Sequence, residues 1–277
     1  MKVVLAYISP NATTRMISRE VSGLFKSDLH EVIELDLGKM GNRDFETIDT
    51  GIFDGADLIG IGSPVYHMDI LEPLRDFLGR ALPVIRRQNP GIKAFIYLTY
   101  GGITSGKAFT NTAGILKRYD VPLVGGLKIK APHFWHRDNY PDEKSIRTVN
   151  AFYRAMAEKK YRKIDRTAAT GQFSNPKMIV RLIYPFVGMI GSIRKRPIDF
   201  DHGKCIKCRK CLNECPVGAI AMDDYPVRDK NRCIYCYHCT TLCPKGAVIF
   251  DVNKIKEFIA LNKKIIGLEQ PENEIFV

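Results

Sequence analysis

The stretch CIKCRKCLNECP, residues 205–216, places four of the eight cysteines of a 277-residue chain within eleven positions. The arrangement returns 28 residues later, so that CIKCRKCLNECPVGAIAMDD (205–224) aligns with CIYCYHCTTLCPKGAVIFDV (233–252). Each copy reads C-x2-C-x2-C-x3-C-P and continues into a Gly-Ala-apolar segment that is typical of a short strand. The repeat therefore predicts a small α+β module near the C-terminal end of the chain.

The composition bears on the chemistry of these cysteines. The chain is 45% hydrophobic and 26% charged, which is ordinary for a globular protein. MKVVLAYISP at the start lacks a cleavage site, and the longest apolar run, 182–193, is too short to cross a bilayer. We therefore expect a cytoplasmic protein, in which clustered cysteines are more often metal ligands than disulfides.

Zinc is the alternative metal for such a pattern. Zinc sites usually combine two C-x2-C pairs across a longer spacer. That reading leaves the third closely spaced cysteine and the Cys-Pro pair of each copy without a purpose, so an iron–sulfur site is favoured.

The module resembles the bacterial-type two-cluster ferredoxins over about 50 residues and uses all eight cysteines. The resemblance implies two [4Fe–4S] clusters, each held by three cysteines of one copy and the fourth cysteine of the other. One cluster then takes Cys205, Cys208, Cys211 and Cys243, and the other takes Cys233, Cys236, Cys239 and Cys215.

Cationic residues flank these cysteines: Lys207, Arg209, Lys210 and Arg232. They would stabilise the reduced clusters and raise their potential, or they would dock a redox partner. Both interpretations are open at this point.

The first 130 residues alternate apolar strand patterns with helical patterns, which indicates a parallel sheet covered on both faces. Five such units fit a flavodoxin-like doubly wound sheet with strand order 2-1-3-4-5. The expected strands are 2–9, 32–37, 56–64, 92–100 and 122–130, with helices over 15–27, 71–80, 103–119 and 142–166. The expected organisation is a sheet domain (1–166), a linker and apolar-basic strap (167–197), the ferredoxin module (198–252) and a C-terminal tail (253–277).

Three turns follow expected strands at the carboxyl edge of this sheet, where doubly wound folds bind ligands. They contain Ser9, Asn11, Ala12, Thr13 and Thr14; then Ser63, Pro64, Val65, Tyr66 and His67; then Thr99, Tyr100, Gly101 and Gly102. A hydroxyl-rich turn that opens a helix offers an anion site, although the same residues also make an ordinary helix cap.

Together the three turns resemble those of the flavodoxin family, which implies bound FMN. The phosphate loop of that family runs Ser/Thr-x-Thr-Gly-x-Thr, which Ser9, Thr13 and Thr14 match. Asn11 replaces a threonine and Ala12 replaces the glycine, whose freedom to adopt positive φ an alanine lacks.

The other two turns match better. The resemblance of GSPVYHMDILEPLRDFL (62–78) to the ring-binding segment implies that Tyr66 stacks on the isoalloxazine and His67 bonds its edge. TYGG (99–102) matches the third loop, where small residues let backbone donors approach the flavin.

The whole chain resembles the flavodoxin–ferredoxin fusion proteins of anaerobic bacteria and archaea. This implies an iron–sulfur flavoprotein, an oxidoreductase or electron carrier that passes electrons between an external carrier, two clusters and FMN. The main alternative is a flavin-free docking scaffold whose ferredoxin module feeds a partner reductase. A third is an FMN reductase whose organic substrate lies under an aromatic lid formed by His133, Trp135, His136 and Tyr140.

The net charge of +12 is concentrated in residues 151–200, which hold 11 Lys+Arg against 3 Asp+Glu. This concentration of positive charge favours an acidic redox protein as partner. Peripheral membrane contact through 176–197 is a less favoured alternative to packing between domains, and nucleic acid is set aside because no recognition motif is present.

Overall fold

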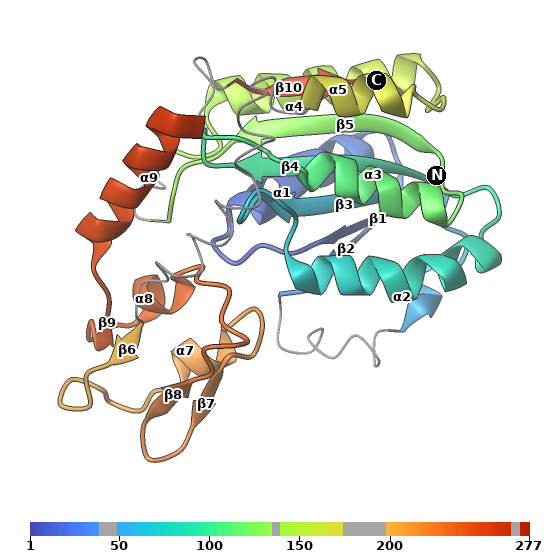
Figure 1. Cartoon of the computed structure of the whole chain (residues 1–277). Coiled ribbons are helices and arrows are strands. Elements are labelled where there is room, and N and C mark those ends of the chain that lie inside the picture. Colours follow the sequence, from blue (N-terminus) through green and yellow to red (C-terminus); the bar gives the residue numbers. More distant parts are fainter. Residues whose placement is uncertain (39–48, 135–138, 174–197, 267–271) are drawn as a thin grey trace.

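The computed structural model describes residues 1–38, 49–134, 139–173, 198–266 and 272–277. Figure 1 shows a sheet flanked by helices and, beside it, a smaller module, with one helix running alongside both. The sheet part contains β1 (Lys2–Tyr7), α1 (Thr13–Ser27), β2 (Glu31–Asp36), η2 (Thr50–Phe53), β3 (Leu58–Pro64), α2 (Glu72–Gln88), β4 (Lys93–Tyr100), α3 (Ala108–Arg118), β5 (Leu123–Lys130), α4 (Glu143–Glu158) and α5 (Arg166–Phe173). The rest comprises β6 (Asp199–Phe200), α7 (Lys210–Asn213), β7 (Ile220–Met222), β8 (Pro226–Arg228), α8 (His238–Leu242), β9 (Val248–Ile249), α9 (Val252–Ile266) and β10 (Glu274–Phe276).

The sheet has the predicted parallel order β2-β1-β3-β4-β5, which confirms the flavodoxin-like doubly wound fold. Its apolar strands are buried on both faces, as parallel sheets require. Helices α1 and α4 cover one face, and α2, α3 and α5 cover the other. Gly62 on β3 makes room for a neighbouring aromatic ring, because a Cβ there would lie 2.3 Å from Tyr97 Cζ.

Helix α2 extends beyond the predicted end at Arg80 and runs to Gln88, although Pro83 lies within it. The buried side chains of Leu82, before the proline, and Ile85, after it, continue the apolar face of the helix. Packing against the sheet therefore outweighs the local helix-breaking tendency.

The C-terminal segment differs from the expected tail. Residues 252–266 form α9, and β10 joins the sheet as a sixth strand, antiparallel to β5, with Glu274 opposite Lys128. Lys128 is only 2% exposed; its ammonium pairs with Glu274 and lies 5.2 Å from the Tyr100 ring centroid. The chain thus leaves the module and returns to the sheet.

Part of the expected linker is also folded. Helix α5 buries Ala169 and Phe173, and the Phe173 ring lies 4.3 Å from that of Phe109. Residues 174–197, which include the predicted strap and membrane-contact segment, lie outside the described residues, as do Trp135 and His136 of the predicted lid. Within the described part of the chain, no helix is long and apolar enough to span a membrane.

The module has an internal repeat that matches its sequence repeat. Helices α7 and α8 occupy equivalent positions, and the two-stranded sheets β6–β9 and β7–β8 are both antiparallel. Backbone φ is positive at matching positions of the two cysteine loops: Lys207 with Tyr235, and Arg209 with Tyr237. Left-handed residues at these points turn each loop back on itself, so both loops curve around a common interior.

Candidate iron–sulfur and flavin site

Cys215 of the first copy lies near cysteines of the second copy. Burial, followed by the neighbouring Cys233, Cys215 and Cys211, raises the pKa of Cys239 to about 12. Burial also raises the pKa of Cys236, with Cys239 and Cys215 among the neighbouring thiols that contribute. Cys215 therefore lies close to the second loop. This proximity supports the crossed ligand set, which stays a prediction for each single ligand.

Backbone donors point at the fourth cysteine of each copy. Ala219 N donates to Cys215 Sγ and Ala247 N donates to Cys243 Sγ, each at 3.2 Å. Such N–H···S bonds stabilise negative charge on a ligand sulfur and raise the potential of a bound cluster. Cysteine thiolates are the usual ligands of [4Fe–4S] clusters, so the donor set of eight cysteines fits this cofactor.

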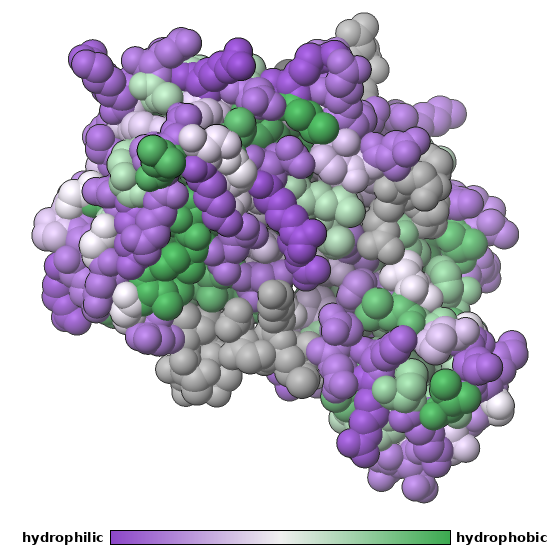
Figure 2. Space-filling view, turned by 180° about the vertical axis from the view of Figure 1, so that it is seen from behind, coloured by the Kyte–Doolittle hydropathy of each residue, from purple (hydrophilic) through white to green (hydrophobic). Residues whose placement is uncertain are grey.

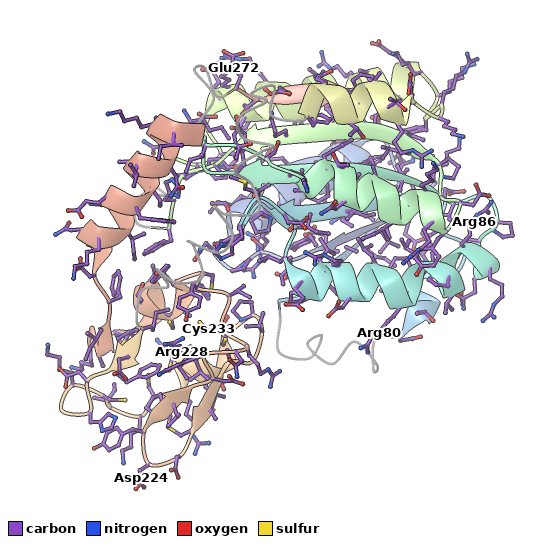
Figure 3. All side chains as sticks on the ribbon, viewed as in Figure 1. Arg80, Arg86, Asp224, Arg228, Cys233 and Glu272 are labelled. Carbon is purple, nitrogen blue, oxygen red and sulfur yellow. The ribbon has the colours of Figure 1, made fainter. Side chains whose placement is uncertain are left out.

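The guanidinium of Arg228 lies next to the second loop. It hydrogen-bonds the hydroxyl of Tyr235 at 3.3 Å and interacts with Cys233, beside which Figure 3 shows it. A cation there favours the reduced, more negative form of the neighbouring cluster.

The three predicted flavin turns come together at the carboxyl ends of β1, β3 and β4. The hydroxyls of Thr14 and Thr99 hydrogen-bond at 2.8 Å, which joins the first turn to the third. Asn11 Nδ2 donates to the hydroxyl of Tyr66 at 2.9 Å, which joins the first turn to the second.

The first turn has the backbone of an anion-binding loop. Ala12 takes the left-handed conformation, with φ 65° and ψ −16°, where the flavodoxin pattern has glycine. The side chain of Ala12 offers no acceptor to the first turn of α1, whose first residues Thr13 and Thr14 are buried. Ser9 Oγ accepts from Arg15 N, an N–H group of that first turn, at 2.9 Å and holds the loop around the helix end. A helix N-terminus in a tight loop fits a phosphate group.

The second turn is a tight hairpin. Tyr66 and Asp69 exchange backbone hydrogen bonds of 3.0 Å, while His67 and Met68 between them have positive φ. Val65 and Tyr66 are half-buried, Ser63 and Pro64 are buried, and His67 is exposed. Burial, with a smaller contribution from Cys236, raises the pKa of Tyr66, so the phenol stays protonated.

The third turn is enclosed by residues that follow β5. A Cβ on Gly101 would lie 2.5 Å from His133 Cε1, and one on Gly102, where φ is 78°, would lie 3.2 Å from Lys130 Cε. Tyr100 is buried and its hydroxyl donates to Glu272 O at 2.8 Å, so it faces the C-terminal segment. The absence of side chains at Gly101 and Gly102 lets His133 and Lys130 approach this backbone closely.

The second cysteine loop is seated on these turns. Asn11 Nδ2 donates to Cys236 O at 2.8 Å, in addition to its bond with Tyr66, and Ile234 packs against the core of the sheet domain. The rings of Phe134 and Tyr237 stack 5.0 Å apart at an interplanar angle of 16°. Sequence reasoning did not anticipate this contact, because no local pattern links residues so far apart.

The comparisons with known proteins agree with this division. Residues 204–247 match the family described as 4Fe-4S dicluster domain, a span that contains all eight cysteines. This part of the chain is a dicluster ferredoxin domain. Two [4Fe–4S] clusters are its cofactors, and it follows a flavodoxin-like sheet domain in the same chain.

Solved structures resemble the sheet part. A flavodoxin from the domain Archaea is 20% identical, covering 57% of this chain and 98% of its own, with a TM-score of 0.45. Flavodoxin 2 from Bacillus cereus is 22% identical, covering 57% and 99%, with a TM-score of 0.43. Rubredoxin oxygen:oxidoreductase from Desulfovibrio gigas is 18% identical, covering 57% and 37%, with a TM-score of 0.42. No curated protein matches the chain.

Proposed function

We propose that this protein is an electron-transfer iron–sulfur flavoprotein that moves electrons between an external redox protein, its two clusters and FMN held by the three turns. When bound, FMN exchanges one or two electrons and each cluster exchanges one, so the fusion joins two-electron chemistry to a one-electron path. The observation that carries the proposal is the seating of the second cysteine loop on the predicted flavin turns, through Asn11, Tyr66 and Cys236.

The residues of the three turns have distinct roles in holding the flavin. The backbone at Ala12 and the N-terminal end of α1 would hold the phosphate, in a loop that includes the buried Thr13 and Thr14. Tyr66, whose raised pKa keeps it neutral, would border the ring. His133, whose ring lies close to the backbone of Gly101, would border the site on that side.

The residues between the two parts set the order of transfer. The cluster predicted for Cys233, Cys236, Cys239 and Cys215 is the inner one, because its loop contacts the flavin turns. The cluster predicted for Cys205, Cys208, Cys211 and Cys243 is the outer one, because its loop is exposed. Electrons that leave FMN for an external carrier then pass through the inner cluster first and the outer cluster second, and electrons that arrive from the carrier pass through the two clusters in the reverse order.

One observation favours a second function, a flavin-free scaffold that only positions the ferredoxin module. The side chain of Asn11 already bonds Tyr66 and Cys236, where the flavodoxin pattern has a threonine. In that case the module would deliver electrons directly to a partner reductase.

Cofactor content of protein purified without oxygen separates the two functions. About eight irons with matching sulfide and one acid-released FMN per chain are expected for the relay. Iron and sulfide without flavin, unchanged after incubation with FMN, would overturn the relay and support the scaffold.

A further inference from the structure

The two cysteine loops are equivalent in sequence but not in surroundings. In the second loop, residues 233–240 are buried or half-buried, and Ile234 and the Cys236 carbonyl contact the sheet domain. In the first loop, residues 206–210 are all exposed, including the cysteine Cys208, and Ile206 is 56% exposed. Figure 1 shows α7, which follows the first loop, farther from the sheet than α8, which follows the second. The repeat therefore presents one loop to the sheet domain and the other to solvent.

Residues at matching positions of the two loops also differ in character, aromatic in the second loop and cationic in the first. Tyr235 and Tyr237 face the interior of the protein, and Tyr237 is 9% exposed and stacks on Phe134. The first loop has Lys207 and Arg209 at those positions, both exposed. The backbone φ is positive at these positions in both loops, so the loop conformation itself does not require a cation at Lys207 or Arg209.

The first loop carries a compact positive charge. Lys204, Lys207, Arg209 and Lys210 lie within seven residues, and no acidic residue occurs from 202 to 213. Asp201 lies 3.4 Å from the Lys204 ammonium and offsets it in part, whereas the Lys207 ammonium rests 4.4 Å from the Tyr225 ring centroid. Asp224, at the end of the β7–β8 turn, points away from the sheet domain in Figure 3. Three cations thus surround an exposed cysteine and an exposed isoleucine.

We infer that this exposed loop, residues 204–210, is the docking surface for a small acidic one-electron carrier protein. The cations attract and orient an acidic face, and Ile206 supplies an apolar centre to the contact. Figure 2 shows the module from behind as mostly hydrophilic with separate hydrophobic spots, which suits a transient partner more than a permanent one. In the step itself the reduced carrier loses one electron and the outer cluster gains it, with no proton or bond exchanged.

This inference rests on the proposed function, because the electron is expected to continue from the outer cluster to the inner cluster and FMN. The test does not depend on FMN, because it measures only the transfer from the carrier to the clusters. The probe is a purified acidic plant-type ferredoxin, whose [2Fe–2S] cluster has a different visible spectrum, reduced chemically and mixed without oxygen with the oxidised protein in a stopped-flow instrument. Reduction of the clusters is followed by their visible absorbance at several salt concentrations, and it can be observed whether or not FMN is bound.

The variant Arg209→Glu/Lys210→Glu is compared with Arg162→Glu/Lys163→Glu, which makes the same charge change at exposed positions of the sheet domain. We expect the second-order rate of the native protein to fall as salt rises. The loop variant should be slower by about tenfold or more at low salt and lose most of its salt dependence, while the control stays within about twofold. Iron content of each variant verifies that the clusters are intact.

Equal slowing of both variants would show that net charge, not this loop, steers the carrier, and no slowing of the loop variant would place docking elsewhere. Either result overturns the inference. A protein that docks the probe as expected but contains no flavin would instead overturn the relay and leave the docking surface standing.

Discussion

Replacing Asn11 with alanine should loosen the second cysteine loop from the sheet domain. Asn11 Nδ2 donates to Tyr66 at 2.9 Å and to Cys236 O at 2.8 Å, and alanine removes both bonds. A neutral hydrogen bond contributes about 1 kcal/mol net, and leaving a half-buried carbonyl without its donor adds up to about 1 kcal/mol. The Cys236 contact alone is therefore expected to contribute about 1.5 kcal/mol, which corresponds to roughly a tenfold increase in the undocked population.

Hydrogen exchange measured without oxygen gives this population directly. In Asn11→Ala, amides in residues 231–240 should exchange about tenfold faster, whereas those in the equivalent exposed segment 203–212 should be unchanged. The control is Tyr66→Phe, which removes the Tyr66 bond but keeps the Cys236 bond, so exchange in 231–240 should stay close to native. In protein that contains flavin, electron transfer between flavin and clusters should slow in Asn11→Ala. Equal acceleration in both segments, or the same acceleration in Tyr66→Phe, would refute the reasoning.

Three further predictions follow from the same geometry. Cys215→Ala should reduce iron from about eight to about four per chain, because Cys215 lies close to the second loop and is predicted to bind its cluster. The electron paramagnetic resonance signal of the remaining cluster should match that of Cys236→Ala; a match to Cys211→Ala would contradict the assignment. Ala12→Gly should stabilise the sheet domain by about 1 kcal/mol, because alanine pays for a left-handed conformation that glycine adopts freely; a lower thermal midpoint would contradict this. Burial lowers the pKa of His133 below its ordinary 6.5, so the contribution of the neutral imidazole to folding stability is fully present above about pH 6.5 and decreases as the pH falls. His133→Gln should therefore flatten the pH dependence of the denaturant midpoint below about pH 6.5. An unchanged slope would count against this prediction.

Much of the fold and the cluster site could be predicted from short-range pattern. The cysteine spacing identifies the dicluster domain because a cubane needs several ligands from one tight loop. The five parallel strands were predicted because strands buried on both faces read as continuous apolar runs. Their order was confirmed, as was the placement of the predicted turns at neighbouring strand ends.

Other features carry almost no local signal. Strand β10 is three residues long, and only its pairing with β5 and the burial of Lys128 against Glu274 give it a structure. Helix α5 was predicted as linker because its sequence, RTAATGQF, has a weak apolar pattern, yet Phe173 finds a partner in Phe109. Both gain their stability from residues far away in the chain, which composition and periodicity do not reveal.

The sequence by itself determined which cofactors the C-terminal module takes and which strand ends meet at the edge of the sheet, since ligand spacing and strand periodicity are local properties. Only the tertiary structure decided that the two equivalent cysteine loops are unequal, one seated on Asn11 and Tyr66 and the other open to solvent. The physical reason is distance along the chain. Asn11 and Cys236 are 225 residues apart, and their hydrogen bond exists only because two separately folded parts bring a side chain and a carbonyl together.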